Sequence, residues 1–261
     1  IHGGGRDLIF PHHENEIAQS EAATGKTLAR YWAHNGFVNI DNEKMSKSLG
    51  NFFTIREVLE RFDAQALRYY LLTTHYRSPI NFSDAGLREA EARVKYLYET
   101  LARLRVVVLH QGPGPDDGPY REPWVGEMQA RFDEAMDDDF NTAKAIGDLS
   151  EAFRLANEIL AQPTRDERDE RTLRVIDSKL REIGSVLGLF EEPAALVLER
   201  LARRRQASLG LDAQAIEALI GERVAARKSR DFARADAIRD ELAHKGIVLH
   251  DGPQGTTWEA G

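Results

Sequence analysis

The chain has 261 residues, of which 42% are hydrophobic and 30% are charged. This length favours two or three domains over one, and the apolar content is ample for buried cores. The formal net charge of −8 argues against a general nucleic-acid-binding protein, which is usually basic, although it leaves room for a local basic face. Cysteine is absent, which excludes disulfides and thiolate ligands within this chain.

The sequence contains no apolar run that approaches the roughly 20 residues of a membrane helix, so we expect no membrane span. It also lacks a signal-peptide pattern. Together with the high charge and the missing cysteines, this predicts a cytoplasmic protein. The sequence begins at Ile1, in what reads as the tail of a strand, so we expect it to be a fragment of a longer protein.

The first forty residues mix strand-like and helical patterns. The run Gly3–Gly5 predicts a turn after a short strand. Pro11 suits the first position of a helix, because its missing N–H would be unpaired there anyway, and Gly25 suits the end of that helix. The β-prone segment Phe37–Ile40 follows. This alternation is typical of the second half of an α/β unit.

From Thr54 onward the pattern is helical. Thr54 and Glu57 have the spacing of a capping box, and Asp63 is a good N-cap residue for the next helix. Ser83 is predicted to cap a long helix over Asp84–Leu109. Apolar side chains recur three, four or seven positions apart in that helix, at Leu87, Val94, Leu97, Leu101 and Leu104.

A predicted loop over His110–Pro119 ends this long helix. Helical periodicity then returns in three segments, Val125–Ala135, Ala143–Leu160 and Arg171–Leu187. Such a run of amphipathic helices with short breaks predicts a helical bundle.

The C-terminal part reads as a small separate unit. The segment Leu201–Gly210 looks like a linker. Two helices are predicted after it, at about Ala213–Lys228 and Phe232–Lys245, and two strands close the chain. The segment Asp251–Gly255, with the sequence DGPQG, predicts the turn between those strands.

The stretch PHHENE contains a candidate metal site. His12 and Glu16 are four residues apart on the predicted helix, so they share one face. An imidazole nitrogen and a carboxylate oxygen at that spacing can both reach one Zn²⁺ ion, although zinc prefers four ligands. His13 and Glu14 are expected to point elsewhere and to support the site from outside the coordination shell. The alternative is a polar helix start, where acidic residues stabilise the helix dipole.

The pentapeptide KMSKS carries two lysines three positions apart, Lys44 and Lys47, together with two serine hydroxyls, and a glycine follows soon after. A mobile cationic loop of this kind can close over a nucleotide triphosphate and stabilise the charge that develops on the leaving pyrophosphate. The alternative is an ordinary solvated basic loop. In the earlier segment HGGGRDL, consecutive glycines let backbone approach a ligand closely, and Asp7 is a possible acceptor for a ribose hydroxyl.

These motifs resemble a known family. KMSKS looks like the second signature of the class I aminoacyl-tRNA synthetases, and the order HGGGRDLIFPHHENEIAQSE, then KMSKSLGNF, resembles the cysteinyl-tRNA synthetases in particular. The later segments DAQALRYYLL, MDDDFNTAKA and DGPQGTTW resemble the same family. The similarity runs over nearly the whole chain, and its first and last blocks are highly specific.

The resemblance implies a mainly α fold with α/β parts: the end of a Rossmann-like catalytic domain, a helical bundle and a small C-terminal α/β domain. The implied boundaries are residues 1–53 for the catalytic part with the KMSKS loop and 54–82 for connecting helices that contact the tRNA stem. Residues 83–200 would form the bundle, and residues 211–261 the anticodon-binding domain.

The family activates cysteine with ATP and Mg²⁺ to cysteinyl-adenylate and then transfers it to tRNA(Cys). An active-site zinc ion binds the substrate thiolate and so discriminates against serine. By motif match, His12 and Glu16 are zinc ligands, and Lys44 and Lys47 are the catalytic lysines of the loop. The resemblance further implies that ATP is bound by Lys47 and by three earlier residues, Gly5, Asp7 and Val38. It leaves the role of His2 open.

The sequence departs from the family pattern in two ways. The other two zinc ligands of the family are upstream cysteines, and its other ATP signature, a His-x-Gly-His turn, also lies upstream. We therefore expect this chain to hold half of the site, to bind zinc weakly and to form no adenylate by itself. The family also implies a monomer.

In the C-terminal unit the resemblance implies contacts with the tRNA anticodon. Arg227 would contact base edges or phosphate, Phe232 would stack on a base, and Asp236 and Asp251 would accept hydrogen bonds from base amino groups. The family more often has Trp where Phe232 stands, so its stacking is expected to be weaker here. Two alternatives stay open: a cysteine ligase of mycothiol synthesis, which would not need this unit, and a tRNA-binding module without catalysis.

Overall fold

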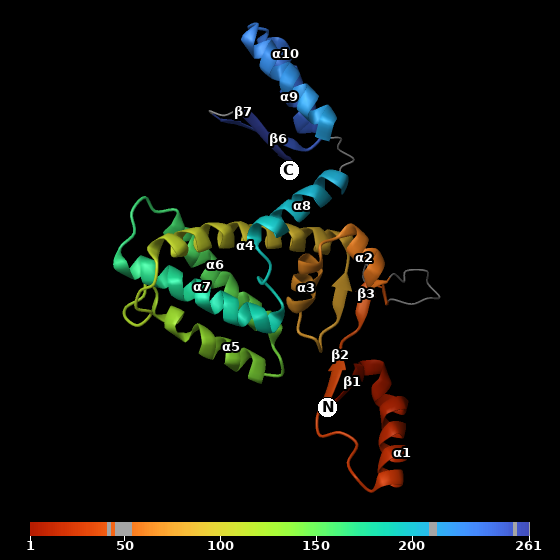
Figure 1. Cartoon of the computed structure of the whole chain (residues 1–261). Helices are drawn as coiled ribbons and strands as arrows, with labels where there is room; N and C mark the ends of the chain where they lie inside the picture. The colour runs from red at the N-terminus through yellow and green to blue at the C-terminus, as the bar shows by residue number, and fades with distance from the viewer. Residues whose placement is uncertain (41–42, 45–53, 209–212, 253–254, 261) are drawn as a thin grey trace. The chain divides into compact units, whose positions relative to one another are not determined.

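The computed structural model describes residues 1–40, 43–44, 54–208, 213–252 and 255–260. The chain divides into two compact units, Ile1–Ala194 and Ala195–Gly261. The described part is mainly helical with small sheets, as the sequence predicts. In Figure 1 the first unit runs from red to teal and the second from cyan to blue.

The N-terminal segment forms a strand–helix–strand unit with parallel strands. Strand β1 (His2–Gly5) pairs in parallel with β2 (Trp32–Asn35), and helix α1 (Glu14–Thr24) lies between them in sequence. The predicted turn over the three glycines is therefore wrong, because they form β1 itself. A side-chain carbon at Gly3 would lie 3.2 Å from the carbonyl oxygen of Ala33, so a glycine strand lets β2 approach closely.

Helix α1 begins later than the sequence predicts. Residues Arg6–Leu8 form a 3-10 turn and Ile9–His13 a π-helical turn, within which Phe10 is extended, with φ −135° and ψ 132°. Pro11 therefore stands before the first regular helical residue, Glu14. The predicted end is confirmed: Gly25 follows the helix in the left-handed conformation, with φ 66°, where glycine carries no Cβ penalty.

A second small sheet joins the N-terminal segment to the first helices. Strand β3 (Val38–Ile40) pairs antiparallel with β4 (Glu43–Lys44) and parallel with β5 (Ile80–Phe82). Helices α2 (Ile55–Arg61) and α3 (Ala64–Leu72) come between β4 and β5 in sequence. Their core is apolar and consists of Val58, Phe62, Leu67, Phe82 and Leu87.

The predicted helix caps are confirmed. The Thr54 side chain accepts from the Glu57 backbone N–H, and the Glu57 carboxylate accepts in return from the Thr54 N–H, which makes a complete capping box. Asp63 accepts from the Gln65 N–H at 2.9 Å, and Ser83 accepts from the Gly86 N–H at 3.1 Å. These local bonds satisfy backbone donors that the first helical turn leaves free.

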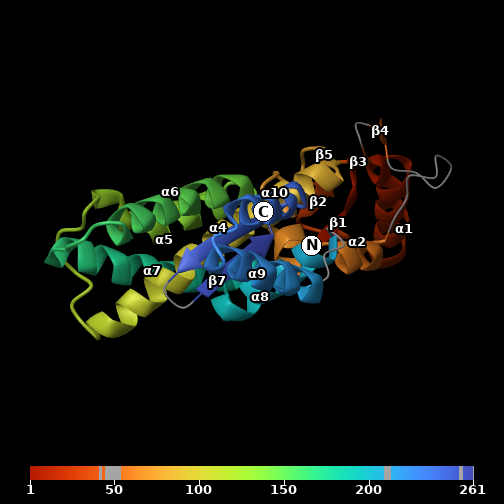
Figure 2. The same ribbon diagram turned by 90° about the horizontal axis from the view of Figure 1, so that it is seen from above.

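The predicted bundle is also present (Figure 2). The long helix α4 (Asp84–Gln111) packs on α6 (Thr142–Leu160) and α7 (Glu167–Leu187). The shorter α5 (Met128–Asp137), preceded by the 3-10 turn η4 (Pro123–Glu127), packs on α6 and α7. The predicted apolar stripe of α4 is buried, with all five residues at most 2% exposed.

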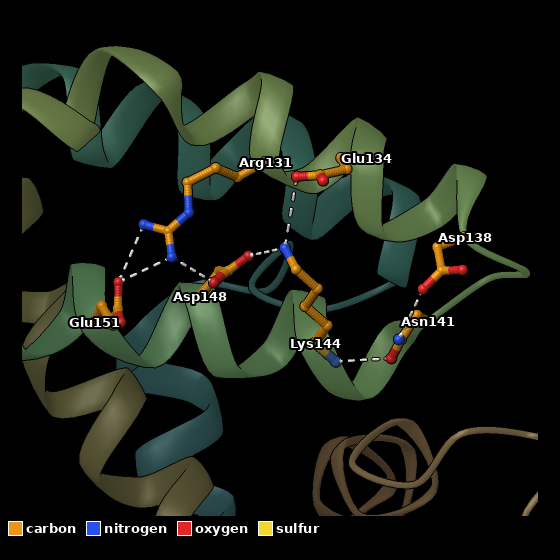
Figure 3. Close-up of polar contacts among 7 residues, drawn as sticks. All are labelled: Arg131, Glu134, Asp138, Asn141, Lys144, Asp148 and Glu151. Carbon is orange, nitrogen blue, oxygen red and sulfur yellow. Dashed lines mark hydrogen bonds and ion pairs between the residues drawn. The ribbon is translucent and has the colours of Figure 1, made fainter.

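Charged side chains join α5 to α6 outside the apolar core (Figure 3). Arg131 on α5 donates to Asp148 at 2.5 Å and to Glu151 at 3.1 Å on α6. Lys144 donates to Asp148 at 3.1 Å and lies 4.0 Å from Glu134. Because these groups are partly solvated, each pair contributes only about 0–1 kcal/mol, and packing carries most of the stability.

The connection between α5 and α6 contains two non-glycine residues in the left-handed region, Asp139 (φ 56°) and Phe140 (φ 55°). The Asp139 carboxylate accepts from the Tyr76 hydroxyl at 2.7 Å and from the Arg77 guanidinium. Tyr76 and Arg77 belong to the loop between α3 and β5, so this contact, the Asp139 clamp, ties that loop to the bundle. Hydrogen bonds from Arg77 and then from Tyr76 lower the pKa of the Asp139 carboxyl to about 2.

Helix α8 (Ala194–Ser208) occupies much of the predicted linker. The predicted linker over Leu201–Gly210 is therefore wrong for the residues up to Ser208, which are helical. Residues 209 and 210 lie outside the part of the chain that the structure describes. The segment LARRRQAS contains mostly strong helix formers and no Gly or Pro, so local propensity favours helix there.

The C-terminal unit has the predicted order of elements. Helices α9 (Ala213–Lys228) and α10 (Phe232–His244) pack together, and β6 (Ile247–Gly252) pairs antiparallel with β7 (Gly255–Ala260). The predicted turn DGPQG is wrong for residues 251, 252 and 255, which belong to the strands, and residues 253–254 lie outside the described part. The small core consists of Ile216, Ile220, Ile238, Leu242 and Ile247. Among the described residues, we find no helix long and apolar enough to cross a bilayer.

We expect Phe153→Ala to destabilise the bundle strongly. Phe153 is fully buried on α6, and its ring packs edge-on against Phe190 at 5.3 Å between centroids. Truncating such a side chain leaves a cavity and should lower the free energy of unfolding by about 3–5 kcal/mol in urea titrations followed by circular dichroism. Val186→Ala, at an α7 position that is 64% exposed, is the control. A loss of less than about 1 kcal/mol for Phe153→Ala would contradict this packing.

The Asp139 clamp predicts a pH-dependent stability. The folded-state pKa lies below the ordinary value of about 3.9, so the ionised clamp stabilises the fold above that pH, and this contribution is lost as pH falls towards about 2. Asp139→Asn keeps a residue that tolerates the left-handed backbone. The stability difference between wild type and this variant should therefore be largest near pH 6–7 and shrink below pH 4. Asp137→Asn is the control, and a pH-independent difference for Asp139→Asn would refute the clamp.

Candidate functional site

The glycine strand β1 positions a cluster of histidines. His13 is 4% exposed, and its Nδ1 lies 2.9 Å from Nε2 of His34 on β2. A side-chain carbon at Gly4 would lie 2.9 Å from Cε1 of His13, so only glycine leaves room for this imidazole. Burial lowers the pKa of His13 and opposes the raising effect of Glu16.

Glu16 on α1 is the centre of this cluster. Its Oε2 lies 2.9 Å from Nε2 of His2 on β1, and its Oε1 lies 3.4 Å from Nε2 of His12. The candidate ligand atoms of His2, His13 and Glu16 all lie within 4.8 Å of one another. His2 and Glu16 also line an open pocket of about 370 Å³. A single carboxylate therefore meets imidazoles from two elements.

The position of His13 corrects one expectation. The sequence placed His13 away from Glu16, but the structure buries it in the same cluster. The reason is that His12 and His13 belong to the π-helical turn that precedes α1, so ideal α-helical spacing does not describe their directions. The pair His12 and Glu16 nevertheless shares one side, as their 3.4 Å separation shows.

The geometry of this pair fits a zinc ion. Two ligand atoms held about 2.1 Å from one tetrahedral Zn²⁺ lie about 3.4 Å apart. The Oε2 atom of Glu16 is buried and has no hydrogen-bond partner among the described residues, since its approach to His2 lacks hydrogen-bond geometry. A buried carboxylate oxygen without a donor is a site that a cation can satisfy. Imidazole and carboxylate are both ordinary zinc ligands.

The predicted nucleotide residues lie in two small sheets. Gly5 ends β1, and Asp7 lies in the turn that follows; a side-chain carbon at Gly5 would lie 2.3 Å from Oδ1 of Asp7. Gly5 therefore leaves the space that the Asp7 carboxylate occupies. Val38 is the first residue of β3, is 38% exposed and pairs with Ile80.

The structure describes only a small part of the KMSKS segment that carries Lys44 and Lys47. Lys44 lies in β4, where it pairs with Asn39, but its side chain is outside the described part. Lys47 lies outside the described residues altogether. The strand before them is fixed by backbone contacts: the Gly36 N–H donates to the Tyr76 carbonyl at 2.7 Å, and the Ile80 N–H donates to that of Phe37 at 2.9 Å.

The predicted RNA-contacting residues cluster in the C-terminal unit. Phe232 begins α10 and is 60% exposed, which leaves its ring free to stack. Asp236 is exposed and lies 3.7 Å from Arg239. Asp251 on β6 is already engaged: it accepts from Arg227 and, in a two-bond pair, from Arg223.

Sequence reasoning missed four residues of these two clusters. Trp32 and His34 were missed because the sequence did not predict strand β2. The ring centroids of Trp32 and His2 lie 4.8 Å apart. His13 was placed outside the cluster for the reason given above. Arg223 carried one usable signal, since it stands four residues before Arg227 on the same helix face.

Three family models match the chain in order along the sequence. Residues 1–92 match the tRNA synthetases class I (C) catalytic domain. Residues 131–191 match the DALR domain, and residues 210–258 match the cysteinyl-tRNA ligase anticodon binding domain.

Curated relatives are similar over almost the whole chain. A "Cysteine--tRNA ligase" of Geobacter metallireducens is 54% identical over 261 residues, which cover 99% of this chain and 54% of that protein. Proteins of the same name from Geobacter sulfurreducens and Anaeromyxobacter dehalogenans are 56% and 51% identical and cover 99% of this chain, with 53% of each relative covered. The chain thus spans about half the length of the curated relatives it matches.

Two solved structures share the fold of the aligned part. One is a LeuRS–tRNA–LeuAMS complex from Agrobacterium radiobacter, with a TM-score of 0.50 and 23% identity over 77% of this chain and 27% of that chain. The other is Mycobacterium tuberculosis methionyl-tRNA synthetase bound by methionyl-adenylate, with a TM-score of 0.50 and 19% identity over 76% of this chain and 43% of that chain.

The three domain models occur in one order, and identity of about 50% extends over 99% of the chain. The chain therefore belongs to the cysteine–tRNA ligase family of class I aminoacyl-tRNA synthetases.

Proposed function

We propose that this chain supplies the metal-holding, pyrophosphate-stabilising and tRNA-contacting portion of a cysteine–tRNA ligase. The enzyme would join cysteine to ATP, release pyrophosphate and transfer the cysteinyl group to tRNA(Cys). The observation that carries the proposal is the 3.4 Å separation of His12 Nε2 and Glu16 Oε1 beside the glycine strand. In a family whose substrate is a thiol, this pair forms half of a thiolate-binding metal site.

His12 and Glu16 would hold the zinc ion, and the metal would supply selective affinity for a thiolate over a hydroxyl group. His13 contributes differently. Its contact with His34 fixes the start of α1 against β2, and so holds the carboxylate of Glu16 near His12 and His2. In this arrangement the strand pair β1–β2 positions the ligands before any metal arrives.

The nucleotide would lie along the same segment. Gly5 leaves space for close backbone approach, Asp7 accepts from the ribose hydroxyls, and the backbone at Val38 contacts the adenine. Lys44 and Lys47 stabilise the negative charge that moves onto pyrophosphate as it leaves. We propose that ATP is bound with Mg²⁺ and that the protein acts as a cytoplasmic monomer.

The C-terminal unit would read the anticodon loop of tRNA(Cys) through Arg227, Phe232, Asp236 and Asp251. The match of residues 210–258 to an anticodon binding domain supports this over ligation of cysteine to an amino sugar, which needs no such unit. A binding module without catalysis would have no use for the KMSKS segment and the His12–Glu16 pair.

We expect the chain to bind Zn²⁺ weakly through His12 and Glu16. His12→Ala and Glu16→Gln should each lower the affinity at least about tenfold, because each removes one ligand of a small set. The measurement is competition with a chromophoric chelator at pH 7.5. His110→Ala, which changes an exposed histidine at the end of α4, should leave the affinity unchanged.

A second substitution distinguishes a site formed by His12 and Glu16 from one formed by His2, His13 and Glu16. His13→Asn should change zinc affinity less than His12→Ala if His13 supports the site without coordinating the ion. If His13→Asn abolishes binding while His12→Ala has no effect, the ligand set is wrong and the ion is held by His2, His13 and Glu16.

We expect Lys47→Ala to slow adenylate formation in a full-length enzyme. This enzyme would combine the present chain with the half of its relatives' sequence that the chain does not cover. Loss of a charge that acts on the transition state should lower the rate of cysteine-dependent ATP–pyrophosphate exchange roughly 100-fold. Affinity for tRNA(Cys) should change less than about twofold, because the lysine acts on the triphosphate.

Lys26→Ala is the matched control, since Lys26 is an exposed lysine just after α1. This chain without the remaining half should give no exchange. Comparable losses in exchange and tRNA affinity for Lys47→Ala, or clear exchange by this chain alone, would count against the proposed division of roles.

A further inference from the structure

A buried arginine lies behind the exposed RNA-contacting residues of the C-terminal unit. Arg223 on α9 is 6% exposed. Its Nη1 donates to Oδ1 of Asp251 and its Nη2 donates to Oδ2, each at 2.9 Å. Two parallel charge-assisted hydrogen bonds of this kind fix both the position and the plane of a carboxylate. Arginine is seldom buried without such a partner.

The Asp251 carboxylate has two further donors. Its Oδ1 accepts from the Thr256 hydroxyl at 2.7 Å, and its Oδ2 accepts from Arg227 Nη1 at 3.0 Å. A carboxylate offers about four acceptor positions, so all of them are filled in the free chain. The hydrogen bonds from Arg223 and then Thr256 hold the pKa of Asp251 well below its usual range, and the group stays ionised.

The donors of Asp251 differ in how easily they can leave. The side chain of Arg223 is 8% exposed, whereas that of Arg227 is 53% exposed. A solvated arginine can exchange its carboxylate for another anion at little expense, while a buried one would be left unpaired. Arg227 is therefore the partner that a ligand can displace, and Arg223 is the one that remains.

The difference in exposure between Arg223 and Arg227 explains how both Arg227 and Asp251 can contact RNA. Arg227 and Asp251 cannot both contact RNA while they are bonded to each other. If Arg227 moves to a phosphate or a base edge, Oδ2 of Asp251 becomes free to accept from a base amino group. Arg223 would still neutralise Asp251 at that moment, so the carboxylate would not be repelled by the RNA backbone.

We propose that Arg223 is a positioning residue for recognition of a single-stranded RNA loop. It touches no RNA; it holds the Asp251 carboxylate so that an acceptor is presented to a base amino group when RNA displaces Arg227. This inference rests on the proposed anticodon-loop contact and deepens it.

The test measures affinity of the whole 261-residue chain for two RNAs: a tRNA(Cys) transcript and the same transcript with its three anticodon bases changed. Arg223→Lys keeps the charge but loses the two-bond geometry. It should weaken binding of the first transcript about tenfold, as should Asp251→Asn, and leave binding of the second unchanged. The double variant should be no weaker than Asp251→Asn alone, because both act through one carboxylate.

Salt dependence separates positioning from direct phosphate contact. Arg223→Lys keeps the charge that neutralises Asp251 and should leave the slope of log affinity against log salt unchanged, whereas Arg227→Ala should reduce it by about 1. In the Asp251→Asn background, where no carboxylate is left to neutralise, Arg223→Met should also leave the slope unchanged. Arg239→Lys, at an exposed arginine of α10, is the control and should have no effect on the preference between the RNAs. A smaller slope for Arg223→Met in the Asp251→Asn background would overturn the inference.

A purely structural role for Arg223 would give a different pattern. Both transcripts would then bind more weakly by the same factor, and the thermal midpoint of the unit would fall. Thr256→Val provides a milder check, because it removes only one donor of Asp251 and should lower the preference two- to threefold. Equal losses on both RNAs would refute positioning. Failure of the wild-type chain to prefer the native anticodon would instead refute the anticodon-loop contact and the inference with it.

Discussion

The close approach of the glycine strand β1 to its neighbours is the constraint on which the candidate site depends. A side chain at Gly3 would press on the β2 backbone, and one at Gly4 would occupy the place of the His13 ring. Because β1 carries no side chains there, His13 is buried against β2 and the start of α1 is held in place. Glu16 lies one helical turn after His12, and its carboxylate contacts both His12 and His2. Local backbone chemistry thus decides where the candidate ligands lie.

The rest of the first unit supports that arrangement through packing. The apolar stripe of α4 forms the centre of the bundle, and charged pairs such as Arg131 with Asp148 lie at its edge (Figure 3). The Asp139 clamp connects the bundle to the loop whose Tyr76 carbonyl accepts from the Gly36 N–H, and Gly36 stands two residues before Val38, the first residue of β3. A continuous set of contacts therefore leads from the bundle to the segment where we place the nucleotide.

The sequence predicted those features that rest on local signals. The capping box at Thr54, the cap at Ser83 and the glycine end of α1 each need only neighbouring residues, and all are present. The pairing of β1 with β2 joins residues thirty apart and carried no local signal, so both the strand and its histidine contacts were missed. The pairing of Arg223 with Asp251 was also missed, because it joins residues 28 apart and neighbouring residues do not indicate it. The linker error over α8 arose because a basic segment was read from its charge, although its helix propensity was high.

The most direct test is the structure of this chain with Zn²⁺ bound, from crystallography combined with X-ray absorption at the zinc edge. The account predicts one zinc ion coordinated by Nε2 of His12 and by the Glu16 carboxylate, at about 2.0–2.2 Å, with His13 still bonded to His34 and outside the shell. Zinc held by His2 and His13 with His12 turned to solvent, or zinc bound elsewhere on the chain, would contradict it.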